Sequence, residues 1–146
     1  MIARQTSTAW WLLLAAWLIA FLSSLAVLFV GEVMGQTPCV LCWFQRAFMF
    51  PLAVILAIAC YRSDFAVWHY AVPLAGIGAL IALWHTLLYV GVIPERIQPC
   101  SATGPSCAGA DMTILGGLPL PLLALIAFST IIVLLLIVRQ NQRLPS

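Results

Sequence analysis

Three long stretches of this chain contain no Asp, Glu, Lys or Arg, and they constrain its fold more than any other feature. They cover residues 5–31, 65–94 and 112–138, and they are 27, 30 and 27 residues long. A helix needs about 20 apolar residues to cross the hydrocarbon of a bilayer. A fourth apolar stretch, residues 43–60, is long enough only if it includes Arg46. The sequence therefore predicts four membrane-spanning segments.

The expected fold is an all-α integral membrane protein, a four-transmembrane-helix bundle that forms a single membrane domain over residues 1–146. Helices are favoured over a β-barrel because the runs are continuously apolar and do not alternate. Only 7% of the residues are charged and 64% are hydrophobic, which excludes a soluble, a disordered or a nucleic-acid-binding chain. The expected spans are residues 10–30, 43–60, 70–92 and 117–138, with outward loops at 31–42 and 93–116.

The first span has Arg4 before it and small residues at Ser23 and Ser24, as a cleavable signal sequence does. Its apolar run continues through Val30, however, which is longer than a signal core. We therefore expect an uncleaved span. In the third span, the small residues Gly76, Gly78 and Ala79 would let neighbouring helices approach closely.

The placement of arginine predicts the orientation. With four spans, both termini share one side of the membrane with the loop between spans two and three. That side carries four of the six Arg, so it is expected to be the cytoplasm. Its charged residues are Arg4, Arg62, Asp64, Arg139 and Arg143, and those of the other side are Glu32, Arg46, Glu95, Arg96 and Asp111.

Four of the five cysteines fall at the outer side. Cys39 and Cys42 lie at the outer end of span two with the Cys-x-x-Cys spacing, and Cys100 and Cys107 lie in the second outward loop. Disulfides persist on that side of a membrane. Three interpretations stay open, namely redox-active pairs, structural disulfides, or a zinc site built from both pairs, although the spacing matches no standard zinc finger. Cys60 is expected to be an ordinary buried apolar residue.

Polar and aromatic residues surround the first cysteine pair. Arg46 follows Cys42 by one helical turn, and with the helix start it is expected to favour the Cys42 thiolate. Because Arg is costly in a span, it is either functional or snorkels to the headgroups. Trp43 and Phe44 are also typical of an interfacial aromatic belt. His85 lies about 10 Å inside span three. Its ring needs a hydrogen-bond partner within the bundle; alternatively, His85 and Arg46 both donate to the carbonyl oxygens of one headgroup.

Residues 38–46, Pro-Cys-Val-Leu-Cys-Trp-Phe-Gln-Arg, resemble the signature of the bacterial disulfide bond formation protein B family (DsbB). The resemblance extends over essentially the whole chain, including the second cysteine pair and Gly-Gly-Leu-Pro at residues 116–119. The vitamin K epoxide reductase family has its cysteines in the opposite chain order and fits less well. Only six residues separate Cys100 from Cys107, which resembles the short-loop branch known as BdbC, as does His85 on span three.

The resemblance implies a quinone-dependent protein-disulfide oxidoreductase. Such an enzyme takes part in electron transport and also assists protein folding, which is a chaperone function. A thioredoxin-like, DsbA-type thiol oxidase would form a mixed disulfide with Cys100. Cys107 would then exchange with Cys39, and Cys42 would reduce a membrane quinone, either ubiquinone or menaquinone. The residues expected to bind the quinone are Arg46, His85, Trp43 and Phe44, and no metal is expected.

The resemblance also implies a multi-pass protein of the bacterial cytoplasmic (inner) membrane, with its redox loops facing the periplasm or exterior. Its expected partners are the thiol oxidase, the membrane quinone pool and the lipid bilayer, and nucleic acid is not among them. One alternative is a non-catalytic membrane subunit whose disulfides are structural and stay oxidised. The other is a metal-binding membrane module, which would lose its ion when either cysteine pair is replaced.

Overall fold

The computed structural model describes residues 2–93, 113–114 and 117–143, and four long helices make up most of it. The helices are α1 (Ile2–Leu28), α2 (Val40–Arg62), α3 (Trp68–Tyr89) and α4 (Leu120–Arg143). α1 continues into a π-helix, η1 (Phe29–Val33), and a 3₁₀ turn, η2 (Phe65–Val67), precedes α3. Two short strands, β1 (Thr113–Ile114) and β2 (Leu118–Pro119), pair antiparallel.

All four helices are long and apolar enough to cross a membrane. The candidate spans are Ser7–Val33, Val40–Arg62, Phe65–Tyr89 and Leu120–Gln142. Each overlaps one of the expected spans, including the second, which holds Arg46. The prediction of an all-α membrane protein with four transmembrane helices is confirmed.

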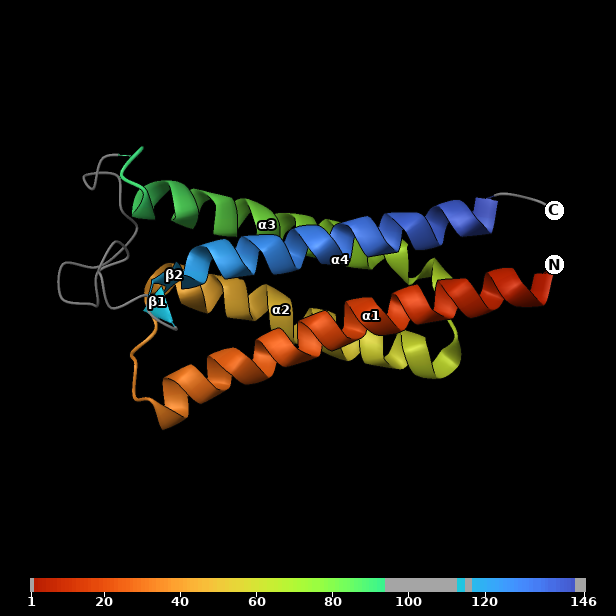
Figure 1. Cartoon of the computed structure of the whole chain (residues 1–146), viewed down its shortest axis with the longest axis horizontal. Coiled ribbons are helices and arrows are strands. Elements are labelled where there is room, and N and C mark those ends of the chain that lie inside the picture. Colours follow the sequence, from red (N-terminus) through yellow and green to blue (C-terminus); the bar gives the residue numbers. More distant parts are fainter. Residues whose placement is uncertain (1, 94–112, 115–116, 144–146) are drawn as a thin grey trace.

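The helices form a ring in chain order. α1 packs on α2, α2 on α3, α3 on α4, and α4 on α1. Successive helices run in opposite directions, so the start of α1 and the end of α4 lie at one end of the bundle (Figure 1). The β1–β2 pair lies at the other end, beside the starts of α2 and α4. We call this the hairpin end, and it is the end that carries the first cysteine pair.

Two of the helix ends that differ from the expected positions lie next to a glycine. α3 ends at Tyr89, short of residue 92, because the chain turns at Gly91 with φ 78°. His85 consequently lies one turn, or about 6 Å, from the end of its helix. α4 begins at Leu120 because the residues before it form β2, which follows Gly117 with φ 145°.

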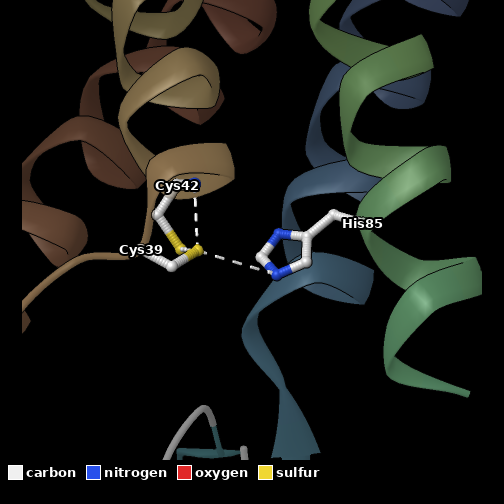
Figure 2. Close-up of side chains that lie close together, drawn as sticks. All are labelled: Cys39, Cys42 and His85. Atoms are coloured by element: carbon white, nitrogen blue, oxygen red, sulfur yellow. Dashed lines mark hydrogen bonds between the residues drawn. The ribbon is translucent and has the colours of Figure 1, made fainter. Parts of the chain in front are cut away.

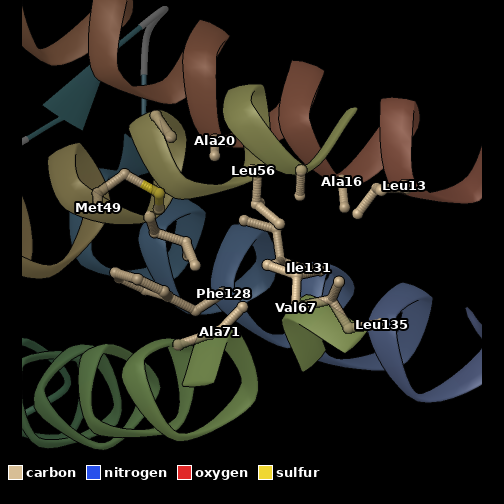
Figure 3. Close-up of a cluster of buried hydrophobic side chains, with 14 of the residues drawn as sticks. Leu13, Ala16, Ala20, Met49, Leu56, Val67, Ala71, Phe128, Ile131 and Leu135 are labelled. Carbon is tan, nitrogen blue, oxygen red and sulfur yellow. The ribbon is translucent and has the colours of Figure 1, made fainter. Parts of the chain in front are cut away.

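The core lies at the centre of the ring, where all four helices contribute apolar side chains (Figure 3). Phe128 of α4 is its largest fully buried side chain. Among the described residues, no buried side-chain nitrogen or oxygen lacks a hydrogen-bond partner. Fully buried members of the core include Leu13, Ala16, Ala20, Leu52, Leu56, Val67, Ala71, Ala75, Phe128, Ile131 and Leu135.

The close approach predicted for span three occurs at Gly78, where α3 meets α4. A Cβ at Gly78 would overlap the ring of Phe128, whereas a Cβ at Gly76 would meet no atom within 4 Å. We expect Gly78→Ala to destabilise the bundle by about 1–3 kcal/mol, because the ring must move within a filled core. The matched variant Gly76→Ala should keep or slightly raise stability, because Ala favours a helix. Thermal unfolding in one detergent compares them, and equal midpoints would contradict this packing.

Candidate active site: a cysteine pair at the start of α2

Cys39 and Cys42 lie where α2 begins. Cys39 is the N-cap residue, with an extended backbone (φ −69°, ψ 168°) after Pro38, and Cys42 lies in the first turn. The backbone N–H of Cys42 donates to Cys39 Sγ at 3.3 Å. A Ser or Asp oxygen usually fills this role at an N-cap. The Cys39 sulfur therefore faces a free helix N–H and the positive end of the helix dipole.

The two thiols are reduced and their sulfurs are 3.0 Å apart. Cys39 is fully buried and Cys42 is partly exposed. The hydrogen bond from Cys42, together with His85 and the backbone N–H, lowers the pKa of Cys39 from 9.0 to about 5, although burial acts in the opposite direction. The sequence pattern favoured a thiolate on Cys42. The structure gathers the stabilising donors on Cys39, because α2 begins at Val40 and the free backbone N–H of Cys42 points back to the capping side chain.

His85 reaches from α3 toward the sulfur pair (Figure 2). Its Nε2 lies 3.8 Å from Cys39 Sγ, and its Nδ1 lies 3.0 Å from Nε2 of Gln45 on α2. His85 is fully buried, and Gln45 is 8% exposed. The sequence indicated that His85 needs a polar partner within the bundle. The structure provides two, Gln45 at Nδ1 and the Cys39 sulfur at Nε2.

Arg46 contacts α1. Its Nη2 donates to the carbonyl of Val27 at 2.8 Å, and its Cζ lies 5.5 Å from the centre of the Trp43 ring. The guanidinium packs on Gly31 in η1, where an added Cβ would come within 3.1 Å of Nη2. π-helical turns such as η1 are frequent at functional sites. The structure thus directs Arg46 and His85 to different neighbours, α1 for the first and the Cys39–Gln45 pair for the second.

Trp43 and Phe44 point out of the bundle. Their side chains are 59% and 50% exposed at the hairpin end. Such exposure fits the interfacial aromatic belt that the sequence suggested. The Arg46 guanidinium also lies over the Trp43 ring in a cation–π contact. This face of α2 therefore presents an aromatic ring and a cation to the surroundings.

Cys100 and Cys107 lie outside the residues that the structure describes. Their disulfide and its exchange with Cys39 stay predictions. Ile93, the last described residue before them, packs against the small apolar cluster around Cys39 and Leu88.

Comparison with known proteins identifies the family. Residues 7–138 match the family described as Disulfide bond formation protein DsbB. The chain belongs to the DsbB family. It is 65% identical over 138 residues to a probable disulfide formation protein of Metapseudomonas resinovorans, with 94% of this chain and 96% of that protein covered. No solved structure matches the chain.

A second relative agrees with the resemblance to the short-loop branch of the DsbB family. Disulfide bond formation protein C of Bacillus subtilis is 38% identical over 130 residues, with 89% of this chain and 94% of that protein covered. The family and the four spanning helices together make this chain a multi-pass membrane thiol–disulfide oxidoreductase that supports disulfide bond formation. The resemblance seen in the sequence is confirmed.

Gln45 is the site residue to which the sequence interpretation gave no role. It lies in the buried row of α2, with Leu41 one turn before it and Met49 one turn after it. A Gln in an apolar row of a membrane helix requires a partner inside the bundle. That signal was present in the sequence, but the identity of the partner depends on how α2 and α3 are rotated about their axes.

The two sulfurs and His85 Nε2 lie within 4.8 Å of one another. Structural zinc sites use four protein ligands, and the described part of the chain brings three donor atoms together here. The absence of a metal in this DsbB family member stays a prediction. Metal analysis of the purified, reduced protein checks it, and a stoichiometric ion lost in Cys39→Ser would contradict it.

The lowered pKa of Cys39 predicts how the reduced site responds to pH. We expect the Cys39 thiolate to persist down to about pH 5. Between about pH 5 and 9 the folded protein holds the thiolate and the unfolded chain holds the thiol. The stability of the reduced protein should therefore rise with pH over this range, and this contribution should be lost as the pH falls through 5.

Ultraviolet absorbance of the thiolate, followed against pH, measures this titration. The protein for it carries serine at Cys60, Cys100 and Cys107, so that only the first pair absorbs. Adding Cys39→Ser should remove the transition near pH 5. A single transition near the ordinary thiol value of 9.0 would contradict the assignment.

Proposed function

We propose that this protein reoxidises a thioredoxin-like, DsbA-type thiol oxidase outside the cytoplasm and passes the electrons to a membrane quinone. The observation that supports this most is the reduced Cys39–Cys42 pair at the end of a spanning helix, between a buried imidazole and a guanidinium. Quinones dissolve in lipid and protein thiols lie in water. A catalyst that joins them has to place its thiols at the boundary, as α2 does.

The proposed location is the bacterial inner membrane, with the hairpin end toward the periplasm or exterior and both termini in the cytoplasm. The excess of arginine at the opposite end of the bundle supports this orientation. At that end, Arg139 of α4 lies with its Cζ 4.5 Å from the ring centre of Trp68 on α3. Such amphipathic anchors suit a membrane interface.

The proposed thiol chemistry begins when a partner thiolate attacks Cys100: the partner–Cys100 bond forms, the Cys100–Cys107 bond breaks, and Cys107 leaves as a thiolate. The partner's second thiol then closes the partner disulfide and releases Cys100. Cys107 attacks Cys39 in the Cys39–Cys42 disulfide. The Cys107–Cys39 bond forms, the Cys39–Cys42 bond breaks, and the electron pair leaves on Cys42. Cys100 then attacks Cys107, so that the second disulfide closes and Cys39 leaves as a thiolate. A thiol of low pKa leaves readily, and the lowered pKa of Cys39 suits this second step.

The face of α2 beside Cys42 fits a quinone headgroup. Arg46 uses one N–H for the carbonyl of Val27 and has further donors for a quinone oxygen. The Trp43 and Phe44 rings offer apolar surface on the lipid side. A bound quinone accepts the electron pair and the protons that the dithiol gives up. Of the four residues expected to bind it, we assign Arg46, Trp43 and Phe44 to the quinone and His85 to the dithiol.

The two sulfurs also determine where the proton of the dithiol lies. In the dithiol, Cys39 Sγ donates to Cys42 Sγ at 3.0 Å. Once Cys39 is a thiolate, it can only accept, and the Cys42 S–H donates to it. Transfer of this proton to Cys39 leaves Cys42 as the thiolate, and the thiolate is the reactive form. Cys42 is also the more exposed residue of the pair, and the Arg46 charge acts on its thiol. The pair can thus hold charge on Cys39 and release it to Cys42.

The test uses the purified full-length protein in detergent with a reduced thioredoxin-like protein and a short-chain quinone. We expect quinone absorbance to fall in step with oxidation of the partner thiols, and parallel runs with ubiquinone and menaquinone analogues to show which is used. A membrane subunit with structural disulfides would instead keep both pairs oxidised and leave the quinone unchanged. That outcome would overturn the proposal.

A further inference from the structure

Gln45 makes a contact that the proposed thiol and quinone chemistry does not require. Its side chain crosses from α2 to α3 and places Nε2 3.0 Å from His85 Nδ1. Both side chains are buried. A buried side-chain pair in an apolar bundle is retained only when its polar atoms are satisfied. The contact therefore constrains the two side chains together.

The direction of this hydrogen bond decides where the imidazole carries its proton. The Gln45 nitrogen is an amide and can only donate, so His85 Nδ1 accepts. A neutral imidazole has one N–H, and with Nδ1 accepting, that N–H is on Nε2. Nε2 is the atom that faces Cys39 Sγ at 3.8 Å. The ring therefore presents a donor to the sulfur.

We propose that Gln45 is a positioning residue that holds His85 in the Nε2-protonated tautomer, so that the imidazole donates to the Cys39 thiolate. With the opposite tautomer, Nε2 would accept from the Cys39 thiol and would stabilise the thiol instead. Gln45 thus acts on Cys39 through His85 without touching it. The inference concerns the same dithiol as the proposed function and deepens it, because it assigns what makes Cys39 a good leaving group.

The consequence lies in the step that frees Cys39. When Cys100 attacks Cys107 in the Cys39–Cys107 disulfide, the Cys100–Cys107 bond forms and the electron pair of the broken bond goes to Cys39. The described groups that act on Cys39 are Cys42 through its S–H and N–H, and His85 through Nε2. The Cys42 donors come from the helix start itself. The His85 donor depends on its tautomer, and hence on Gln45.

The direct test reads the tautomer by NMR of isotope-labelled histidine in the reduced full-length protein. The chain has two histidines, so His69→Gln leaves His85 as the single ring observed. We expect the proton on Nε2 in this background. Gln45→Glu has the same size and, when ionised, can only accept, so a proton should appear on Nδ1. A residue that merely fills space would tolerate this change without moving the proton.

The second readout is the equilibrium between the Cys39–Cys42 dithiol and its disulfide in glutathione buffers, with the other three cysteines replaced by serine. Gln45→Met removes the hydrogen bond and keeps the volume. It should shift the equilibrium about tenfold toward the disulfide, because the thiolate loses one donor. The control Thr86→Val lies beside His85 on α3 and removes only a hydrogen bond to the carbonyl of Ala82. It should change neither readout.

Two results would overturn the inference. One is a reduced protein with the His85 proton on Nδ1. The other is a Gln45→Glu protein with the proton still on Nε2 alone, combined with a Gln45→Met equilibrium equal to that of the Thr86→Val control. Neither readout involves quinone or a protein partner. A protein that reduces no quinone but shows the expected tautomer and shift would overturn the proposed function and leave this inference supported.

Discussion

We expect Cys42→Ser to slow quinone reduction by about a thousandfold or more, because it removes the sulfur proposed to react with the quinone. The fold should tolerate the change. The backbone N–H of residue 42 still donates to Cys39 Sγ, and a serine hydroxyl can replace the thiol as the hydrogen-bond partner of Cys39. Stopped-flow absorbance of the quinone, with reduced partner protein in excess, measures the rate.

The matched control is Cys60→Ser, at the far end of the same helix. Cys60 is half-buried and packs at the edge of the core, away from the hairpin end. Its replacement should leave the rate of quinone reduction unchanged. In Cys42→Ser, a mixed disulfide between Cys39 and an outer-loop cysteine should accumulate, and peptide mapping under non-reducing conditions would show it. Quinone reduction at the normal rate would refute the role of Cys42.

The second large effect is expected at Arg46. Arg46→Gln keeps a side-chain donor for the Val27 carbonyl and removes the charge. A hydrogen bond from a charged group contributes about 1.5–3 kcal/mol, so the KM for quinone should rise by about tenfold to a hundredfold. The rate at saturating quinone and the thermal midpoint should change much less, since the anchoring contact to α1 survives.

Arg62→Gln is the control for loss of charge on α2, because Arg62 lies in the last turn at the opposite end. It should leave the KM for quinone unchanged. If Arg46→Gln also left this KM unchanged, Arg46 would be a structural tie between α1 and α2 and would not belong to the quinone site. Comparison of both variants in the same detergent separates the two roles.

Much of the fold follows from local composition. Charge-free runs predict the spans because a spanning helix must satisfy its backbone internally and expose apolar side chains. The helix ends were less predictable. α3 ends near Gly91 and α4 starts after β2, and both depend on backbone turns that hydropathy does not register. Gly76 and Gly78 look alike in the sequence, but only Gly78 meets an aromatic ring, because the rotation of α3 directs one toward Phe128.

The site shows the same division. The Cys-x-x-Cys spacing, Arg46 and His85 predict that the hairpin end is the reactive end. The partner of each polar side chain could not be predicted. Arg46 and His85 were expected to act on one headgroup, whereas the structure holds Arg46 on α1 and His85 between Gln45 and Cys39. Residues on one helix share a spacing, but their partners lie on helices far away in the sequence.

The sequence by itself determined that this protein spans the membrane four times and carries a cysteine pair near the start of its second spanning helix. Those properties depend on the free energy of transferring side chains from water to lipid. That free energy is determined by the composition of each segment, independently of the other segments. Only the tertiary structure decided that Cys39 receives the thiolate-stabilising contacts and that Gln45 orients His85 toward it. Those properties depend on where α2 begins and on how α2 and α3 face each other, since hydrogen bonds act over about 3 Å and require both partners in place.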